Sequence, residues 1–232
     1  MFFISRRKQF GPVTFLWDVE APDVARAARP GHFVMARIDE HGERIPLTVA
    51  DFDVSRGTVT VVVQAVGKTT HEMMLLKEGD AILDFIGPLG LPSHIRKLDG
   101  TVVLVGGGLG VAPIYPQLRE YKNMGNRTVS IVGFRTRDLV FWEEQFRAVS
   151  DELIVTTDDG SYGRKGFVTH ALADVLGISA CPARFGWLGR RAQKTRVRFT
   201  TLATKSAVTT MSCFTWHPVR SFCSTTRAVL AS

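Results

Sequence analysis

The segment TVVLVGGGLGVAP, residues 101–113, decides the fold of the second half of this chain. Thr101–Val105 is a short, fully apolar run, typical of a strand that is buried on both faces of a parallel sheet. Gly106–Gly110 supplies four glycines, and a helix of about a dozen residues is predicted from Ala112 onward. Glycines at this point permit positive φ angles and let a phosphate reach the backbone N–H groups at the helix N-terminus. The segment therefore predicts a strand, a nucleotide-binding turn and a helix.

Residues 97–178 continue the alternation of strand and helix. The predicted strands are Thr128–Phe134 and Leu153–Thr157, and the predicted helices are Leu139–Ala148 and Gly166–Leu176. This order indicates a parallel sheet with crossover helices. The glycine spacing of the common dinucleotide fingerprint is absent, so an ordinary tight turn remains the alternative interpretation of the glycines.

Residues 1–96 are rich in short strands instead. Turn residues separate the strands, and Thr69–Leu76 is predicted to be a short helix. The predicted strands are Val13–Val19, His32–Ile38, Ile45–Val49, Thr58–Val66 and Ala81–Ile86. Strands at this spacing favour a six-stranded antiparallel barrel. The predicted fold class is therefore β plus α/β, with the boundary between the two domains near residues 91–100.

One predicted barrel strand carries the groups that a flavin dinucleotide requires. Such a cofactor needs a cation at its pyrophosphate, an apolar side chain against its ring and a hydrogen-bonding group near its reactive nitrogen. Arg44, Leu47 and Thr48 supply these groups. Gly67–Thr70 offers a second phosphate site through backbone N–H groups and hydroxyls. A strand with one Arg and one Thr is more often an ordinary edge strand, so the interpretation depends on its neighbours.

The net charge of +7 is concentrated in the last quarter of the chain. Residues 179–232 contain nine Lys or Arg and no Asp or Glu, which leaves 20 basic and 22 acidic side chains for residues 1–178. The last quarter shows neither helical nor strand periodicity, so an irregular basic tail is predicted. All three cysteines lie there, at Cys181, Cys213 and Cys223, and their wide spacing is no disulfide framework.

Several stretches of the chain resemble the small flavin subunits of the ferredoxin–NADP reductase superfamily. They are Val19–Pro22, Arg29–Val34, Glu43–Asp51, Gly87–Gly90, Gly106–Pro113 and Thr157–Gly163. The nearest branch contains the electron-transfer subunit of dihydroorotate dehydrogenase and the small subunits of sulfide dehydrogenase and of NADH-dependent ferredoxin–NADP oxidoreductase. The resemblance covers residues 1–178. It implies an FAD-binding barrel at 1–96 and an NAD(P)-binding domain at 97–178, which we expect to be truncated.

The resemblance also implies which residues hold FAD and NAD(P)H. For FAD they are Arg44, Pro46, Leu47 and Thr48, with Gly67, Thr69 and Thr70 at the pyrophosphate. Thr48 is expected to be the catalytic group beside the reactive flavin nitrogen. For NAD(P)H they are Gly107, Gly108, Gly110 and Pro113, with Arg135, Asp159 and Gly160 near the cofactor. Arg135 and Arg137 suit a 2′-phosphate, which hints at NADP.

The iron–sulfur site of that branch has no counterpart in this sequence. Its members bind a [2Fe–2S] cluster through a closely spaced set of cysteines, and such a cluster takes four thiolates. Here 31 residues lie between Cys181 and Cys213, and nine lie between Cys213 and Cys223. We predict that this chain binds neither the cluster nor another metal.

The leading functional hypothesis is a flavin-dependent oxidoreductase subunit that passes electrons from NAD(P)H through FAD to an iron–sulfur or flavoprotein partner. The expected partner is a larger subunit of the flavoprotein, glutamate-synthase-like or dihydroorotate dehydrogenase-like kind. A second hypothesis is an inactive or misfolded product, because the loss of pattern after residue 178 is what a shifted reading frame produces. A third is a nucleic-acid or acidic-partner binder acting through the tail, which is disfavoured because no recognisable binding module accompanies the charge.

The sequence also bears on the location of the protein. No apolar run approaches the roughly 20 residues that span a bilayer. The N-terminus places its charge after a very short apolar patch, whereas a secretory signal has the reverse order. We therefore expect a cytoplasmic protein without membrane contact.

Overall fold

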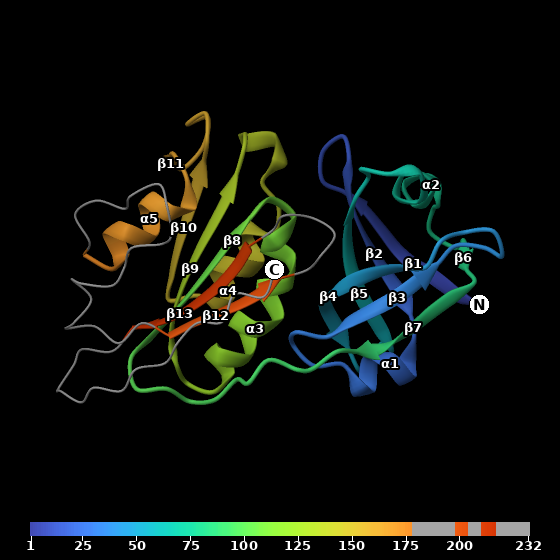
Figure 1. The fold of residues 1–232 in the computed structure, drawn as a ribbon, viewed down its shortest axis with the longest axis horizontal. Helices are drawn as coiled ribbons and strands as arrows, with labels where there is room; N and C mark the ends of the chain where they lie inside the picture. Colours follow the sequence, from blue (N-terminus) through green and yellow to red (C-terminus); the bar gives the residue numbers. More distant parts are fainter. Residues whose placement is uncertain (178–197, 204–209, 217–232) are drawn as a thin grey trace, which may run out of the picture.

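The computed structural model describes residues 1–177, 198–203 and 210–216. These residues form two sheets that lie side by side (Figure 1). The first is an antiparallel barrel from the N-terminal half of the chain, and the second is a mainly parallel sheet covered by helices. The predicted fold class is therefore confirmed.

Seven antiparallel strands form the barrel, in the order β6-β1-β2-β5-β4-β3-β7. They are β1 (Phe2–Gln9), β2 (Thr14–Glu20), β3 (Phe33–Arg37), β4 (Ile45–Asp53), β5 (Thr58–Gln64), β6 (Ala81–Ile82) and β7 (Asp84–Leu89). The structure thus has one strand more than the six predicted. The predicted strand 81–86 divides at Leu83, whose backbone N–H donates to the carbonyl oxygens of Arg37 (3.0 Å) and Ile38 (2.9 Å).

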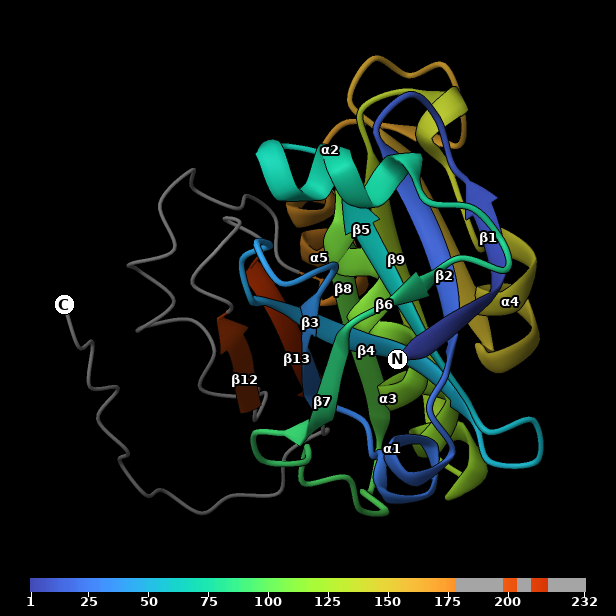
Figure 2. The same cartoon turned by 90° about the vertical axis from the view of Figure 1, so that its right-hand side faces the viewer.

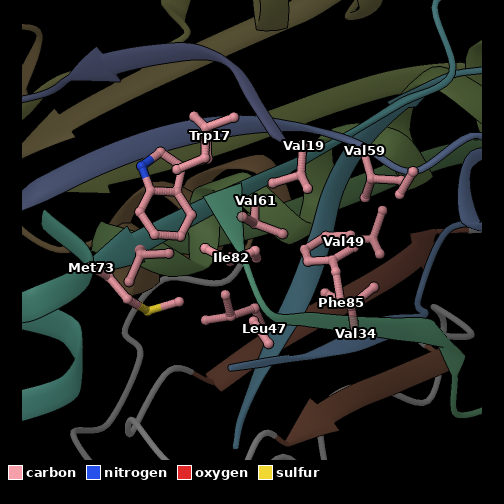
Figure 3. Close-up of a cluster of buried hydrophobic side chains, with 14 of the residues drawn as sticks. Trp17, Val19, Val34, Leu47, Val49, Val59, Val61, Met73, Ile82 and Phe85 are labelled. Atoms are coloured by element: carbon pink, nitrogen blue, oxygen red, sulfur yellow. The ribbon is translucent and has the colours of Figure 1, made fainter. Parts of the chain in front are cut away.

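The barrel encloses a single apolar core (Figure 3). Side chains alternate along a strand, so Phe15, Trp17 and Val19 of β2 point inward. Two helices lie at opposite ends of the barrel, namely α1 (Pro22–Ala27) and α2 (Lys68–Leu75) (Figure 2). Met73 of α2 is fully buried and lies near the Trp17 ring, so α2 is held firmly against one end of the barrel (Figure 3).

The second sheet begins with four parallel strands in the order β11-β10-β9-β8. They are β8 (Thr101–Gly107), β9 (Arg127–Phe134), β10 (Glu152–Thr157) and β11 (Arg164–Lys165). The helices α3 (Val111–Asn123) and α4 (Glu143–Val149) cover the face toward the barrel, and α5 (Val168–Val175) covers the other face (Figure 1). Among the described residues, no helix has both the length and the apolar composition needed to cross a bilayer.

Two further strands extend this sheet at the far edge of β8. β13 (Thr210–Trp216) pairs antiparallel with β8, and β12 (Arg198–Ala203) pairs antiparallel with β13. Both strands lie within the tail that the sequence predicts to be irregular. They form by pairing outward from the edge of β8, and local periodicity in the sequence does not indicate such pairing. The other predictions for residues 179–232, including those for Cys181 and Cys223, fall outside the described residues.

The connection between the two sheets is attached to both of them. The backbone N–H of Ser93 donates to the carbonyl oxygen of Pro30 beside the barrel (2.8 Å), and the Ser93 hydroxyl donates to Gln117 of α3 (3.2 Å). Gly31 has a φ of +95°, and a Cβ there would lie 2.5 Å from the Ser93 hydroxyl oxygen. Only glycine fits at this close approach.

Candidate cofactor site

The strand β4 turns one face to the barrel core and the other toward α3. Leu47 and Val49 are buried in the barrel core, so the side chains between and beside them, Pro46 and Thr48, face outward. Ala50 then joins a second buried cluster, which contains Val111 and Ala112 of the first turn of α3. The outward face of β4 is therefore directed at the start of α3.

Thr48 and Leu47, although adjacent, are placed very differently. The Thr48 side chain is half-buried, and within the described part of the chain no protein group hydrogen-bonds its hydroxyl. The hydroxyl is thus available to a ligand on the outward face. The Leu47 side chain is only 9% exposed and lies in the barrel core. Its predicted contact with a flavin ring can therefore be made only by its backbone.

Arg44 shares a carboxylate with a second arginine. Its Nη2 lies 2.9 Å from Oδ2 of Asp84, and Nε of Arg37 lies 2.8 Å from the same oxygen. Two guanidinium groups on one carboxylate leave a positive charge where β3, β4 and β7 meet, as a pyrophosphate site requires. Arg37 and Asp84 were not predicted from the sequence, since neither belongs to a recognisable motif and only the cross-strand pairing places them beside Arg44.

The predicted phosphate turn, Gly67–Thr70, opens α2 as expected. The Thr70 hydroxyl accepts hydrogen bonds from the backbone N–H groups of Val66 and Gly67, both at 2.9 Å, so it holds the turn in shape. Thr69 is 8% exposed and lies beneath the turn. A Cβ added at Gly67 would meet no atom within 4 Å, so a ligand has room to approach the first N–H groups of the helix.

The glycine turn after β8 combines a packed glycine with two open ones. A Cβ at Gly106 would lie 2.9 Å from the carbonyl oxygen of Gly110, which is itself buried at the N-terminus of α3. A Cβ at Gly107 or Gly108 would meet nothing within 4 Å. Gly108 has a φ of +53°, which favours glycine. Pro113 lies in the first turn of α3. The open glycines form a cradle of bare backbone at a helix N-terminus, which suits a phosphate.

The remaining predicted nucleotide residues lie at the same edge of the sheet. Arg135 follows β9, and Asp159 and Gly160 follow β10, so all come after the carboxyl ends of parallel strands, where ligands of such sheets bind. The loop is fixed to β9 because Asp159 N donates to the Arg135 carbonyl oxygen (3.3 Å). The Asp159 carboxylate accepts hydrogen bonds from the backbone N–H of Ser161 (2.9 Å) and its hydroxyl (2.7 Å), which lower the pKa of Asp159.

Known proteins are similar to this chain in sequence and in fold. Over 169 residues the chain is 51% identical to the "dihydroorotate dehydrogenase B (NAD(+)), electron transfer subunit homolog" of Thermotoga maritima, an alignment that covers 73% of this chain and 59% of the relative. The structure of an NADH-dependent reduced ferredoxin–NADP oxidoreductase is similar at a TM-score of 0.70 and 46% identity, covering 75% of this chain and 62% of that one. The chain has the fold of the ferredoxin reductase-like family.

Two facts qualify the match of this ferredoxin reductase-like chain to its relatives. No protein-family model matches it. It spans about three fifths of the length of the curated relatives, with 59% of the first and 62% of the second covered.

At the level of fold alone, the chain is similar to a ferredoxin–NADP⁺ reductase of Neisseria gonorrhoeae solved with bound FAD and NADP. The TM-score is 0.62 at 17% identity, covering 77% of this chain and 80% of that one.

Proposed function

We propose that this chain is an electron-transfer subunit that oxidises NADH with a bound FAD. The observation that carries the proposal is the orientation of β4, whose outward face bears Thr48 and is directed at the first turn of α3. That turn follows the open backbone of Gly107 and Gly108. A flavin on β4 and a nicotinamide on the glycine turn would therefore meet in one interface. The name of the Thermotoga maritima relative supports this assignment.

The residues present fit FAD. When bound, FAD supplies the redox chemistry, because its ring accepts a hydride and releases electrons singly. The chain binds and orients it: Arg44 meets the pyrophosphate charge, and the first turn of α2 offers backbone N–H groups beside Gly67. The Thr48 hydroxyl, which no protein group among the described residues hydrogen-bonds, would bind the reactive edge of the ring. Hydride transfer needs no protein acid or base, so the protein contributes alignment and the exclusion of water.

The loop after β10 favours NADH over NADPH. Asp158 and Asp159 are both exposed after the carboxyl end of β10, and hydrogen bonds from Ser161 lower the pKa of Asp159. Two carboxylates would repel a 2′-phosphate, whereas a ribose 2′-hydroxyl can donate to either. Arg137, a candidate partner for that phosphate, has its guanidinium 5.4 Å from the centre of the Tyr162 ring. The name of the Thermotoga maritima relative, with NAD(+), agrees with this choice.

The electron acceptor is proposed to be a larger oxidoreductase subunit, of the flavoprotein, glutamate-synthase-like or dihydroorotate dehydrogenase-like kind. The relatives' designation as an electron transfer subunit points to such a partner. The three cysteines of this chain are too widely spaced for the usual [2Fe–2S] site. We therefore propose that electrons leave the flavin for a redox centre held by the partner.

The test is an anaerobic titration of the purified full chain after incubation with FAD. We expect a yellow protein whose visible flavin absorption is bleached by NADH and far more slowly by NADPH. The variant Gly107→Val is the matched control, because its side chain occupies only the nucleotide cradle. It should stay yellow and resist bleaching. A wild-type protein that retains no FAD would overturn the proposed function.

A further inference from the structure

A row of polar side chains crosses the outer face of the barrel toward α3. Residues that stand directly opposite one another on neighbouring strands are Arg6 and Asp18, then Asp18 and Thr60, then Thr60 and Asp51. Opposite residues point to the same face of a sheet. The row therefore runs over β1, β2, β5 and β4 in that order.

Two of the three neighbouring pairs in this row, Arg6–Asp18 and Asp18–Thr60, are in direct contact. Nε of Arg6 lies 2.7 Å from Asp18, and the Thr60 hydroxyl donates to Asp18 at 2.5 Å, although the Asp18 side chain is only 1% exposed. At the other end, Nη1 of Arg119 on α3 lies 2.6 Å from Oδ1 of Asp51. The Asp51–Arg119 ion pair thus connects the barrel to the parallel-sheet half of the chain.

The Arg119 guanidinium is enclosed on several sides. It lies 5.5 Å from the ring centre of Phe52 on β4 and 5.6 Å from that of Tyr115 on α3, within the range of cation–π contact. Tyr115 in turn packs against Trp142 and Phe146, with ring centres at 5.3 and 5.6 Å. Arg119 is therefore held in one place by both halves of the chain.

The two partners of this ion pair continue the two cofactor segments. Asp51 comes three residues after Thr48 on β4, and Arg119 comes nine residues after Gly110 on α3. Between these elements, Ala50 of β4 and Val111 of α3 belong to one buried apolar cluster. Apolar contacts have no preferred direction, whereas a charged N–H···O bond fixes both distance and angle. The ion pair is thus a directional contact that resists sliding of α3 along β4.

We propose that Asp51 and Arg119 are positioning residues that set the register between the flavin and the nicotinamide, an inference that rests on the proposed function. Hydride transfer needs reacting atoms about 3–3.5 Å apart, and a displacement of about 1 Å costs about 100-fold in rate. Loss of the pair therefore slows hydride transfer at saturating NADH much more than it weakens NADH binding.

Stopped-flow bleaching of the FAD-loaded full chain separates these two effects. Asp51→Asn and Arg119→Met should each slow hydride transfer at least about tenfold at saturating NADH, with the NADH dissociation constant changed less than about threefold. Arg119→Lys keeps the charge and should recover part of the rate. The control is Lys122→Met. Lys122 lies on α3, as Arg119 does, but its 2.5 Å ion pair is with Asp151, which also belongs to the parallel-sheet half.

Hydrogen exchange of the chain without nicotinamide gives a readout independent of turnover. Amides of residues 45–53 and 111–123 should exchange faster in Asp51→Asn and Arg119→Met than in Lys122→Met. A wild-type rate of bleaching in both variants, or unchanged exchange, would overturn the inference. If the wild type binds no FAD, the proposed function fails, and the exchange data alone still decide whether the pair holds the two elements in register.

Discussion

Gly106 and Gly107 are neighbours with opposite surroundings. A methyl group at Gly106 would press against the carbonyl oxygen of Gly110 at 2.9 Å and against Ile114 at 3.0 Å, whereas one at Gly107 would meet no atom within 4 Å. Gly106 is thus required for packing β8 against α3, and Gly107 is not. The space beside Gly107 is therefore room for a ligand.

Gly107→Val and Gly106→Ala should separate binding from folding. Gly107 has an extended backbone, which valine adopts readily, so Gly107→Val should unfold at the wild-type temperature but lose NADH binding. Gly106→Ala should destabilise the chain by about 1–3 kcal/mol through overpacking. Thermal unfolding and NADH titration check the pair. Normal NADH binding by Gly107→Val would mean that the nucleotide lies elsewhere.

Arg44→Met should weaken FAD binding about 10- to 100-fold, because a charge-assisted hydrogen bond contributes about 1.5–3 kcal/mol. The measurement is the quenching of flavin fluorescence on titration with the apoprotein. Arg37→Met is the comparison, since both arginines share Asp84 but the Arg44 side chain is 53% exposed and Arg37 only 20%. An equal loss in both variants would assign the effect to the cluster instead of Arg44.

Asp159→Asn should increase the use of NADPH. The substitution removes a negative charge while its amide oxygen still accepts the hydrogen bonds from Ser161. We expect kcat/KM for NADPH to rise about tenfold and that for NADH to fall. Glu152→Gln, at the opposite end of β10, should change neither value. No change in either coenzyme's kinetics with Asp159→Asn would place the 2′-position away from this loop.

His32 should make stability fall in acid. Its ring is 8% exposed, and Nδ1 accepts a hydrogen bond from the backbone N–H of Arg29 (3.1 Å). Burial, with a smaller contribution from the Arg29 charge, lowers the pKa of His32 below 6.5. The unfolded chain then binds a proton at a higher pH than the folded chain, so the free energy of unfolding decreases as the pH falls below 6.5.

Urea unfolding between about pH 8 and about pH 5 checks this prediction. In His32→Gln the decrease over this range should be smaller than in the wild type, because the titrating ring is gone. An identical decrease in the two proteins would assign the acid sensitivity to other groups.

Local patterns predicted the elements that have strong local causes. The apolar run before Gly106 became β8, and Gly67 opens α2 as expected. Phe2–Gln9 was not predicted as a strand, because its alternation is broken by a register shift between Ile4 and Arg6. α1 was missed because its six residues are too few to show a helical period.

Contacts between distant segments could not be predicted from the sequence. Asp84 and Arg119 belong to no motif, and only the assembled strands and helix bring them to Arg44 and Asp51. For Leu47, the motif predicted a contact between its side chain and the flavin ring, but strand alternation directs that side chain into the barrel core. The strand β13 pairs with β8, a distant segment of the chain, as well as with β12.

The two hydrogen bonds of Ser93 bear on how the two halves of the chain are held together. Because Ser93 is hydrogen-bonded to Pro30 on one side and to Gln117 on the other, the connector is anchored to both halves of the chain. Under the proposed function, the flavin and nicotinamide sites would then be brought together when the chain folds. The entropy lost on bringing the two sites together would in that case be lost on folding, before NADH binds.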